Sequence, residues 1–238
     1  MQSEKPTTLN GRARSWCRWC CARRALRSCR EPVAGAGISI SGRLRVPLGS
    51  SDDAVARAER LQTTLGEGPC LAAIASADPL MADLESIAVC WPMFHHQLVA
   101  QTPFRSVVAL PLFSPRERLR CGALDLYLTT PDSEHDFSNA FIAEVMSAVA
   151  DPIAGALFDE RPVDQPAAEG LIPWLGNRQA RDRMHVWAAL GILIEHSGLS
   201  DTAALAALRG YAFSHDTSLD DVADDLRAER LAPEAVMS

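Results

Sequence analysis

Cysteines and histidines are the residues of this sequence with the widest range of chemistry, and it holds seven and six of them. Four cysteines lie in the segment RSWCRWCCARRALRSCR, at positions 17, 20, 21 and 29. Cys17 and Cys20 have the spacing of one half of a zinc site, but such a site needs a second close pair, and Cys29 stands alone. We therefore predict no metal here, and expect residues 1–30 to be a frayed first helix or a wrongly assigned start of the reading frame.

A second group that raises the question of a metal consists of Cys90, His95 and His96. Neighbouring histidines point in different directions from a helix, so only one of the two can join a common site. A lone cysteine usually packs as a small hydrophobic residue. No glycine-rich phosphate loop, G-x-S-x-G or H-E-x-x-H motif occurs, so the sequence predicts no metal ligand, no cofactor and no catalytic residue.

The net charge of −7 is unevenly distributed: residues 1–30 carry +7, residues 31–173 carry −10 and residues 174–238 carry −4. Binding of nucleic acid without sequence preference depends on Lys and Arg, so the acidic body argues against it. No run of about 18 apolar residues occurs, and the N-terminus lacks the apolar stretch of a secretory signal. We expect a cytoplasmic protein with free thiols and no membrane contact.

The elements that must position these residues follow from periodicity and turn signals. The runs VAGAGISI and RLRVPLGS predict a hairpin around Ser41-Gly42. A helix follows, with Ser51 as its N-cap and two aspartates in its first turn. Further along come a strand at LMADL, a helix at WPMFHHQLVAQ, strands at SVVALPLF and CGALDLYL, and a long helix over 136–158, kinked by Pro152. This order predicts an α+β domain with a mainly antiparallel sheet and flanking helices.

Five blocks in this region, LGEGPCLAA, LMADL, WPMF, RSVVALPLF and CGALDLYL, resemble the GAF domains of actinobacterial regulators. The resemblance covers roughly residues 33–160 and implies a GAF-like sensor domain, assigned to 31–160, that senses a small ligand or redox state. Gly66 and Gly68 permit a tight loop, and the helix N-terminus after it would face an anionic ligand. The candidate ligand-binding residues are Gly68, Pro69 and Cys70. The alternative is that this loop only closes the core.

An enzyme remains a remote alternative. One GAF-fold family, the free methionine sulfoxide reductases, works through cysteines, and Cys70 and Cys90 lie in blocks similar to that family's cysteine blocks. The family has a further cysteine just upstream of its GEGPC-like block and an acid at the start of the following strand, and this sequence has neither. We therefore expect no enzymatic activity.

A proline-rich, acidic stretch, DERPVDQPAAEGLIP, marks a linker over residues 161–173. Residues 174–238 then predict a small all-α domain of three helices. The first ends at Gly198, the second is capped by Ser200 or Asp201 and the third by Thr217 or Ser218. The predicted buried faces are Met184, Trp187, Gly191 and Ile194 beside Leu190 in the first helix, Leu205, Leu208 and Ala212 in the second, and Leu219, Val222, Ala223 and Leu226 in the third.

The blocks GILI, SGLSDTAALAALR, LRGYA and SLDDVADDL resemble the ANTAR domain over residues 174–230. The order GAF, linker, ANTAR resembles a common actinobacterial regulator type. ANTAR proteins bind nascent RNA, typically a pair of short stem-loops, and prevent transcription termination. The resemblance therefore implies a signal-responsive RNA-binding regulator of transcription antitermination.

Motif positions assign the RNA contacts to Arg183, Arg209 and Tyr211, and phosphate contacts are added by Arg178, Arg181 and His215. The family usually has a lysine where this sequence has Leu190, and the region is acidic. The alternative is a dimerising sensor or interaction protein whose ANTAR-like bundle no longer binds RNA. In both cases we expect a homodimer, since the 136–158 helix is apolar over a wide arc and both resembled families tend to pair through helices.

Overall fold

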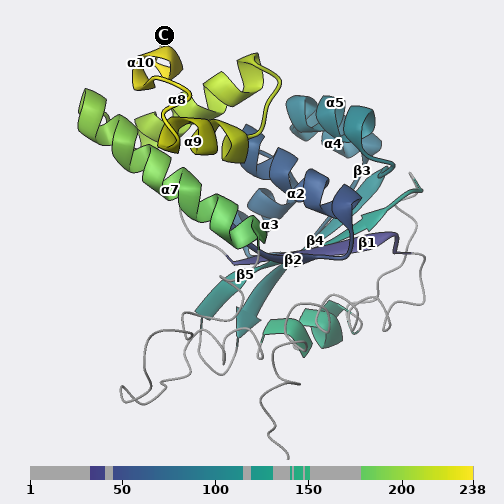
Figure 1. Ribbon diagram of the computed structural model, residues 1–238. Coiled ribbons are helices and arrows are strands. Elements are labelled where there is room, and N and C mark those ends of the chain that lie inside the picture. Colours follow the sequence, from purple (N-terminus) through teal and green to yellow (C-terminus); the bar gives the residue numbers. More distant parts are fainter. Residues whose placement is uncertain are drawn as a thin grey trace, which may run out of the picture.

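The computed structural model describes residues 33–40, 45–114, 119–130, 140, 142–146, 148–150 and 178–237. The Cys/Arg-rich segment 1–30, the Ser41-Gly42 turn, Pro152 and the linker 161–173 lie outside the described residues. Those that are described form an α+β structure with an antiparallel sheet and helices (Figure 1). None of its helices is long and apolar enough to cross a membrane.

A five-stranded sheet forms the centre of the N-terminal part, in the order β2-β1-β5-β4-β3, and every neighbouring pair is antiparallel. The predicted hairpin and the three later strands are confirmed. The strands are β1 (Gly35–Ile40), β2 (Val46–Ser50), β3 (Leu80–Asp83), β4 (Ser106–Ser114) and β5 (Leu119–Leu128).

The helices are α2 (Asp53–Leu65), α3 (Pro69–Ser76), α4 (Leu84–Cys90), α5 (Pro92–Gln101), α7 (Arg178–Ser197), α8 (Asp201–Ser214), α9 (Leu219–Arg227) and α10 (Pro233–Val236). The sequence predicted α2, α3, α5, α7, α8 and α9, but it did not predict α4 or α10. The predicted cap at Ser51 is wrong, because Asp52 caps α2 by accepting from the Val55 amide. The Ser51 hydroxyl instead accepts from the Ala36 amide of β1, so it joins helix to sheet.

The two faces of the sheet have different side chains. On one face lie Gly35 and Gly37, where a Cβ atom would overlap the Val55 and Glu59 side chains of α2. These glycines let α2 approach the strands closely. The opposite face is aliphatic, and the helical residues 142–146 and 148–150 lie against it (Figure 1). Its buried side chains include Ile38, Val108, Leu110, Leu124 and Leu126.

The C-terminal helices form a second core whose faces were predicted only in part. All four predicted residues of α9 are buried, as are Leu208 and Ala212 of α8. In α7 the predicted burial of Met184 and Trp187 is wrong, because they are 54% and 42% exposed. The prediction for Leu190 is confirmed, because contact with α8 and α9 buries the neighbouring stripe of α7, which consists of Val186, Ala189, Leu190 and Leu193.

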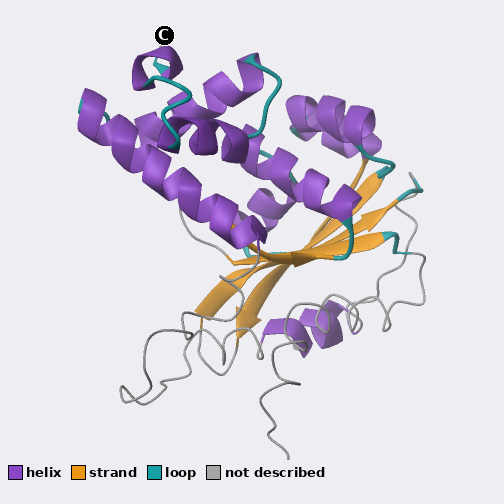
Figure 2. Ribbon diagram, viewed as in Figure 1, coloured by secondary structure: helices purple, strands orange, loops and turns teal. Residues whose placement is uncertain are grey.

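The helical unit packs directly on the sheet domain. Helix α7 lies along the edge strand β2, and α8 and α9 contact α2 (Figure 2). Two hydrogen bonds cross this junction: Arg209 Nε donates to the Thr63 carbonyl at 3.1 Å, and the Leu219 amide donates to Thr64 Oγ1 at 3.2 Å. The end of α2 is therefore the docking surface for α8 and α9.

Position 190 tests the assignment of the second core. Leu190 is 4% exposed, so Leu190→Lys buries an ammonium group without a partner and should lower the free energy of unfolding by about 3–5 kcal/mol. Chemical denaturation measures this change. The control is Ala188→Lys on the exposed face of α7, which should change stability by less than about 0.5 kcal/mol. Equal effects of the two substitutions would contradict the assignment.

Candidate functional site

A buried cluster of charged side chains lies between α2 and the sheet. Arg45, 4% exposed, precedes β2 and forms an ion pair with Glu59 of α2. Its Nη2 atom is 3.6 Å from Asp125 Oδ2 of β5, and its Nε donates to Ser39 Oγ of β1 at 3.0 Å. One guanidinium thus connects three strands and one helix. We refer to Ser39, Arg45, Glu59, Gln62, Cys70, Asp125 and Tyr127 as the polar core.

Gln62 connects the charged part of the polar core to its neighbours. Its Nε2 donates to Asp125 Oδ2 and to the Tyr127 hydroxyl oxygen, both at 3.0 Å. Its Oε1 accepts from the Cys70 amide at 2.9 Å, and the Tyr127 hydroxyl donates to Glu59 Oε1 at 2.7 Å. Glu59 and Gln62 are on one face of α2 because they are three residues apart.

Burial controls the protonation of the polar core. Removal from water and then the charge of Glu59 raise the pKa of Asp125 well above its ordinary value. The same two causes raise the pKa of the Tyr127 hydroxyl. Burial lowers the pKa of Arg45, but the acidic groups around it, Cys70, Glu59 and Asp125, raise it by more. The pKa therefore lies above its ordinary value, and the guanidinium stays charged.

The predicted ligand residues Gly68, Pro69 and Cys70 are all buried beside the polar core. Pro69 begins α3, as predicted. The N-terminus of that helix faces Gln62, since the Cys70 amide donates to it and a Cβ atom at Gly68 would meet the same side chain. In this conformation a protein side chain occupies the position assigned to an anionic ligand.

The two cysteines of the reductase alternative differ in environment. Cys70 is buried and its thiol pKa is raised, chiefly by removal from water. Cys90, the last residue of α4, is exposed. A buried thiol that resists ionisation is a poor nucleophile. In the described ranges no cluster of three or more metal-ligating side chains forms around Cys90, His95 and His96.

Arg183 and Arg209, the principal predicted RNA contacts, both lie at the junction with α2. Arg183 is 2% exposed, and its Nη1 is 3.2 Å from Asp220 Oδ1 of α9. Arg209 is half-buried, and its guanidinium lies against Gly66, where a Cβ atom would meet it. Burial lowers the pKa of both groups, and the charge of Arg183 lowers that of Arg209 further. Arg183 therefore has almost no contact with solvent, whereas Arg209 is partly accessible.

The remaining predicted contacts are more accessible. Tyr211 is half-buried, and its ring stacks on His215 with 3.9 Å between centroids. His215, at the end of α8, is exposed, and so is Arg181 of α7. Arg178 begins α7, but its side chain lies outside the described residues. Of the predicted RNA contacts, Tyr211 and His215 therefore lie together, whereas Arg183 and Arg209 lie against α2.

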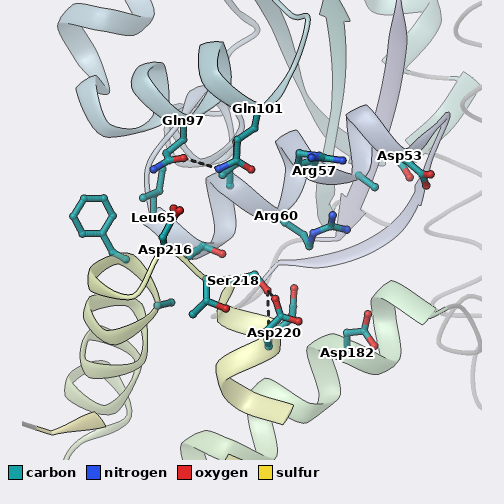
Figure 3. A pocket seen from close by; sticks show the side chains of 18 of the residues that line it. Asp53, Arg57, Arg60, Leu65, Gln97, Gln101, Asp182, Asp216, Ser218 and Asp220 are labelled. Carbon is teal, nitrogen blue, oxygen red and sulfur yellow. Dashed lines mark hydrogen bonds between the residues drawn. The ribbon is translucent and has the colours of Figure 1, made fainter. Parts of the chain in front are cut away.

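A cleft of about 820 Å³ separates the sheet domain from the C-terminal helices. Helices α2 and α5 form one side, and α7 with the α8–α9 turn forms the other (Figure 3). Five aspartates and two arginines line it, so its walls are acidic on balance. Those seven are Asp53, Arg57, Arg60, Asp182, Asp216, Asp220 and Asp221.

Sequence reasoning missed the polar core, although one signal was present. Asp125 and Tyr127 alternate with leucines in the strand CGALDLYL, where an aspartate at a buried position must find a partner. Glu59 and Gln62 follow Val55 on the inner face of α2, which marks this face as partly polar. The partner of these acids, Arg45, lies in a segment that looked like an ordinary hairpin strand.

No protein-family model and no curated protein matches the sequence. Among solved structures, the chain is similar to the type II free methionine-R-sulfoxide reductase from Thermoplasma acidophilum. The two are 15% identical, the match covers 62% of this chain and 96% of that chain, and the TM-score is 0.42.

The raised pKa of Asp125 predicts a specific pH dependence of stability. The folded protein keeps a proton that the unfolded chain loses above the ordinary aspartate pKa. The contribution of Asp125 to stability should therefore be fully present below that ordinary value and be lost as the pH rises toward the folded-state pKa, by at most about 1.4 kcal/mol per pH unit for one proton. Asp125→Asn should flatten this decline, as measured by denaturant unfolding across the pH range.

The matched control is Asp78→Asn, at an exposed position before β3. It should keep the slope of the parent protein, because Asp78 lies outside the polar core. Identical slopes for the parent and Asp125→Asn would show that Asp125 takes up no extra proton on folding.

The two cysteines should also differ in reactivity. Iodoacetamide should label Cys90 in the native protein and leave Cys70 unmodified, since the Cys90 thiol is exposed and the Cys70 thiol is buried. Peptide mapping by mass spectrometry measures the extent of labelling at each site. In denaturant both should react, and equal rates in the native protein would contradict the burial of Cys70.

Proposed function

We propose that this protein is a signal-responsive RNA-binding regulator that prevents transcription termination. Its GAF-like sensor part spans residues 31–160, and its ANTAR-like part spans residues 174–238. The proposal is supported by the order of the elements, an α+β sheet domain followed by a bundle of short helices. It is also supported by the ANTAR-like blocks that contain Arg209 and Tyr211.

The observation that carries the proposal is the position of the arginines. Arg209 donates to the Thr63 carbonyl of α2, and Arg183 is buried against Asp220. RNA phosphates need accessible guanidinium groups, so contact with RNA and docking on α2 compete for Arg209. We infer that the docked conformation is the inactive one, and that release of α8 and α9 from α2 frees the RNA-binding side chains.

Helix α2 is also the route for the signal. Glu59 and Gln62 on its inner face belong to the polar core. Thr63 and Thr64 in its C-terminal turn accept hydrogen bonds from Arg209 and Leu219. A change in the polar core that moves this helix would alter the docking surface. Sensing and RNA binding are therefore linked through one rigid element.

A second candidate is favoured by the exposed apolar face of α7. Met184 and Trp187 lie one turn apart, and both are more than 40% exposed. Such a face suits a protein partner, and the acidic helical unit would then serve dimerisation or signalling without RNA. The reductase alternative is weakened by the burial of Cys70, whose thiol is a poor nucleophile in this environment.

Thr64→Val tests the proposal without changing a predicted RNA contact. The substitution removes the oxygen that accepts from the Leu219 amide across the junction. The loss of one such hydrogen bond is worth about 0.5–1.5 kcal/mol, so undocking should become roughly two- to tenfold more favourable. Crosslinking of the full chain to cellular RNA, followed by sequencing, should recover more stem-loop RNA by a similar factor.

Thr129→Val, at an exposed position after β5, is the matched control and should recover as much RNA as the parent protein. Arg209→Ala should recover less than Thr64→Val, because it removes a phosphate contact as well as a docking bond. If none of these proteins recovers stem-loop RNA, the interaction protein replaces the RNA-binding regulator.

A further inference from the structure

The cleft between α2 and the α8–α9 turn keeps opposite charges apart. Arg57 and Arg60 lie on α2, one turn apart, and neither guanidinium forms an ion pair with any described residue. Asp216 and Asp221 line the other side (Figure 3 labels Arg57, Arg60 and Asp216). Asp220 is paired with Arg183 and also feels the charge of Arg60, so the charged groups of the cleft that can meet a third molecule are Arg57, Arg60 and Asp216.

The size and lining of the cleft limit what that molecule is. A volume of about 820 Å³ lies within the range of small-molecule sites, roughly 300–1,000 Å³. Leu61 and Leu65 of α2 and Phe213 of α8 provide apolar surface between the charged walls. A pure anion would be repelled by Asp216 and Asp221, and a pure cation would leave the two arginines without a counter-ion.

The spacing of residues along α2 limits the length of a ligand that fits this cleft. The α8–α9 turn meets the C-terminal end of α2, since Leu219 and Arg209 bind Thr64 and Thr63 there. Asp216 belongs to this turn and has φ of 50°. With a rise of about 1.5 Å per residue, Arg60 and Leu65 are roughly 8 Å apart along the helix axis. A ligand that reaches both walls must separate its charges by a similar distance.

We propose that this cleft binds a small elongated zwitterion, with its carboxylate on Arg57 and Arg60, its aliphatic stem over Leu61 and Leu65, and its ammonium group on the Asp216 wall. The site is separate from the buried residues Gly68, Pro69 and Cys70 beside the polar core. No covalent step is involved.

The proposed ligand also has a regulatory consequence, which rests on the proposed function. The ligand contacts both α2 and the α8–α9 turn, so it binds the docked conformation better than the released one. Binding that favours one conformation shifts the population toward it. The ligand should therefore hold Arg209 on α2 and reduce RNA binding.

Isothermal titration calorimetry of the full chain with ε-aminocaproate tests the site. This zwitterion should bind, whereas caproate and hexylamine, which each carry one of its charges, should bind at least tenfold more weakly. Glycine, whose charges are too close to reach both walls, should not bind. Equal affinity for caproate or hexylamine, or no binding of ε-aminocaproate, would overturn the proposal.

Two exposed substitutions locate the binding. Arg57→Gln and Asp216→Asn should each weaken binding of ε-aminocaproate by roughly tenfold, the loss expected for one charge-assisted hydrogen bond. Arg227→Gln and Asp78→Asn change the same residue types at exposed positions outside the cleft and should leave the affinity unchanged. If Arg57→Gln and Asp216→Asn also leave it unchanged, the ligand binds elsewhere and the site is wrong.

RNA crosslinking with and without ε-aminocaproate separates this inference from the proposed function. Reduced RNA recovery, restored by Asp216→Asn, supports both. Calorimetric binding without any RNA recovery supports the cleft and contradicts the RNA-binding regulator. RNA recovery that ε-aminocaproate leaves unchanged, despite calorimetric binding, contradicts the regulatory consequence alone.

Discussion

The guanidinium of Arg45 has to be neutralised inside the protein, and the arrangement of β1, β5 and α2 satisfies this requirement. An uncompensated charge in the interior costs several kcal/mol, so its partners must be held within contact distance. Glu59 provides the opposite charge, and Ser39 and Asp125 provide further oxygen contacts, each from a different element. Glu59 reaches the cluster only because α2 lies close to the strands.

That close approach depends on small residues. A Cβ atom at Gly37 would overlap the Glu59 side chain, so glycine at this position and the ion pair of Glu59 are parts of one arrangement. The height of α2 above the sheet in turn fixes where Thr63 and Thr64 lie. Because Arg209 and Leu219 form hydrogen bonds with those two residues, the position of the C-terminal helices depends indirectly on the buried charge of Arg45.

The candidate site was predictable in part. Gly68, Pro69 and Cys70 were expected at the start of a helix beside the sheet, and they are there, but Gln62 occupies the place assigned to a ligand. Glu59 and Asp125 are sixty-six positions apart in the sequence, and nothing local indicates that Arg45 pairs with both. The cleft was not predictable at all, since its walls come from opposite ends of the described chain.

The sequence by itself determined the elements, because their signals are local. The apolar run of β4, the alternating leucines of β5, Ser200 before α8 and Gly198 after α7 each act within a few residues of their own position. The amphipathic pattern of α9 also placed its buried face correctly, because only one face of that short helix is apolar.

Only the tertiary structure decided which surfaces meet. Helix α7 has two stripes with helical spacing, and contact with α8 and α9 buries Leu190 while Trp187 stays exposed. Arg183 and Arg209 have the same sequence signal whether they face solvent or another helix. Arg209 is half-buried because it docks on α2, and Arg183 is buried beside Asp220 of α9, because the accessibility of a side chain depends on partners that are distant in the chain.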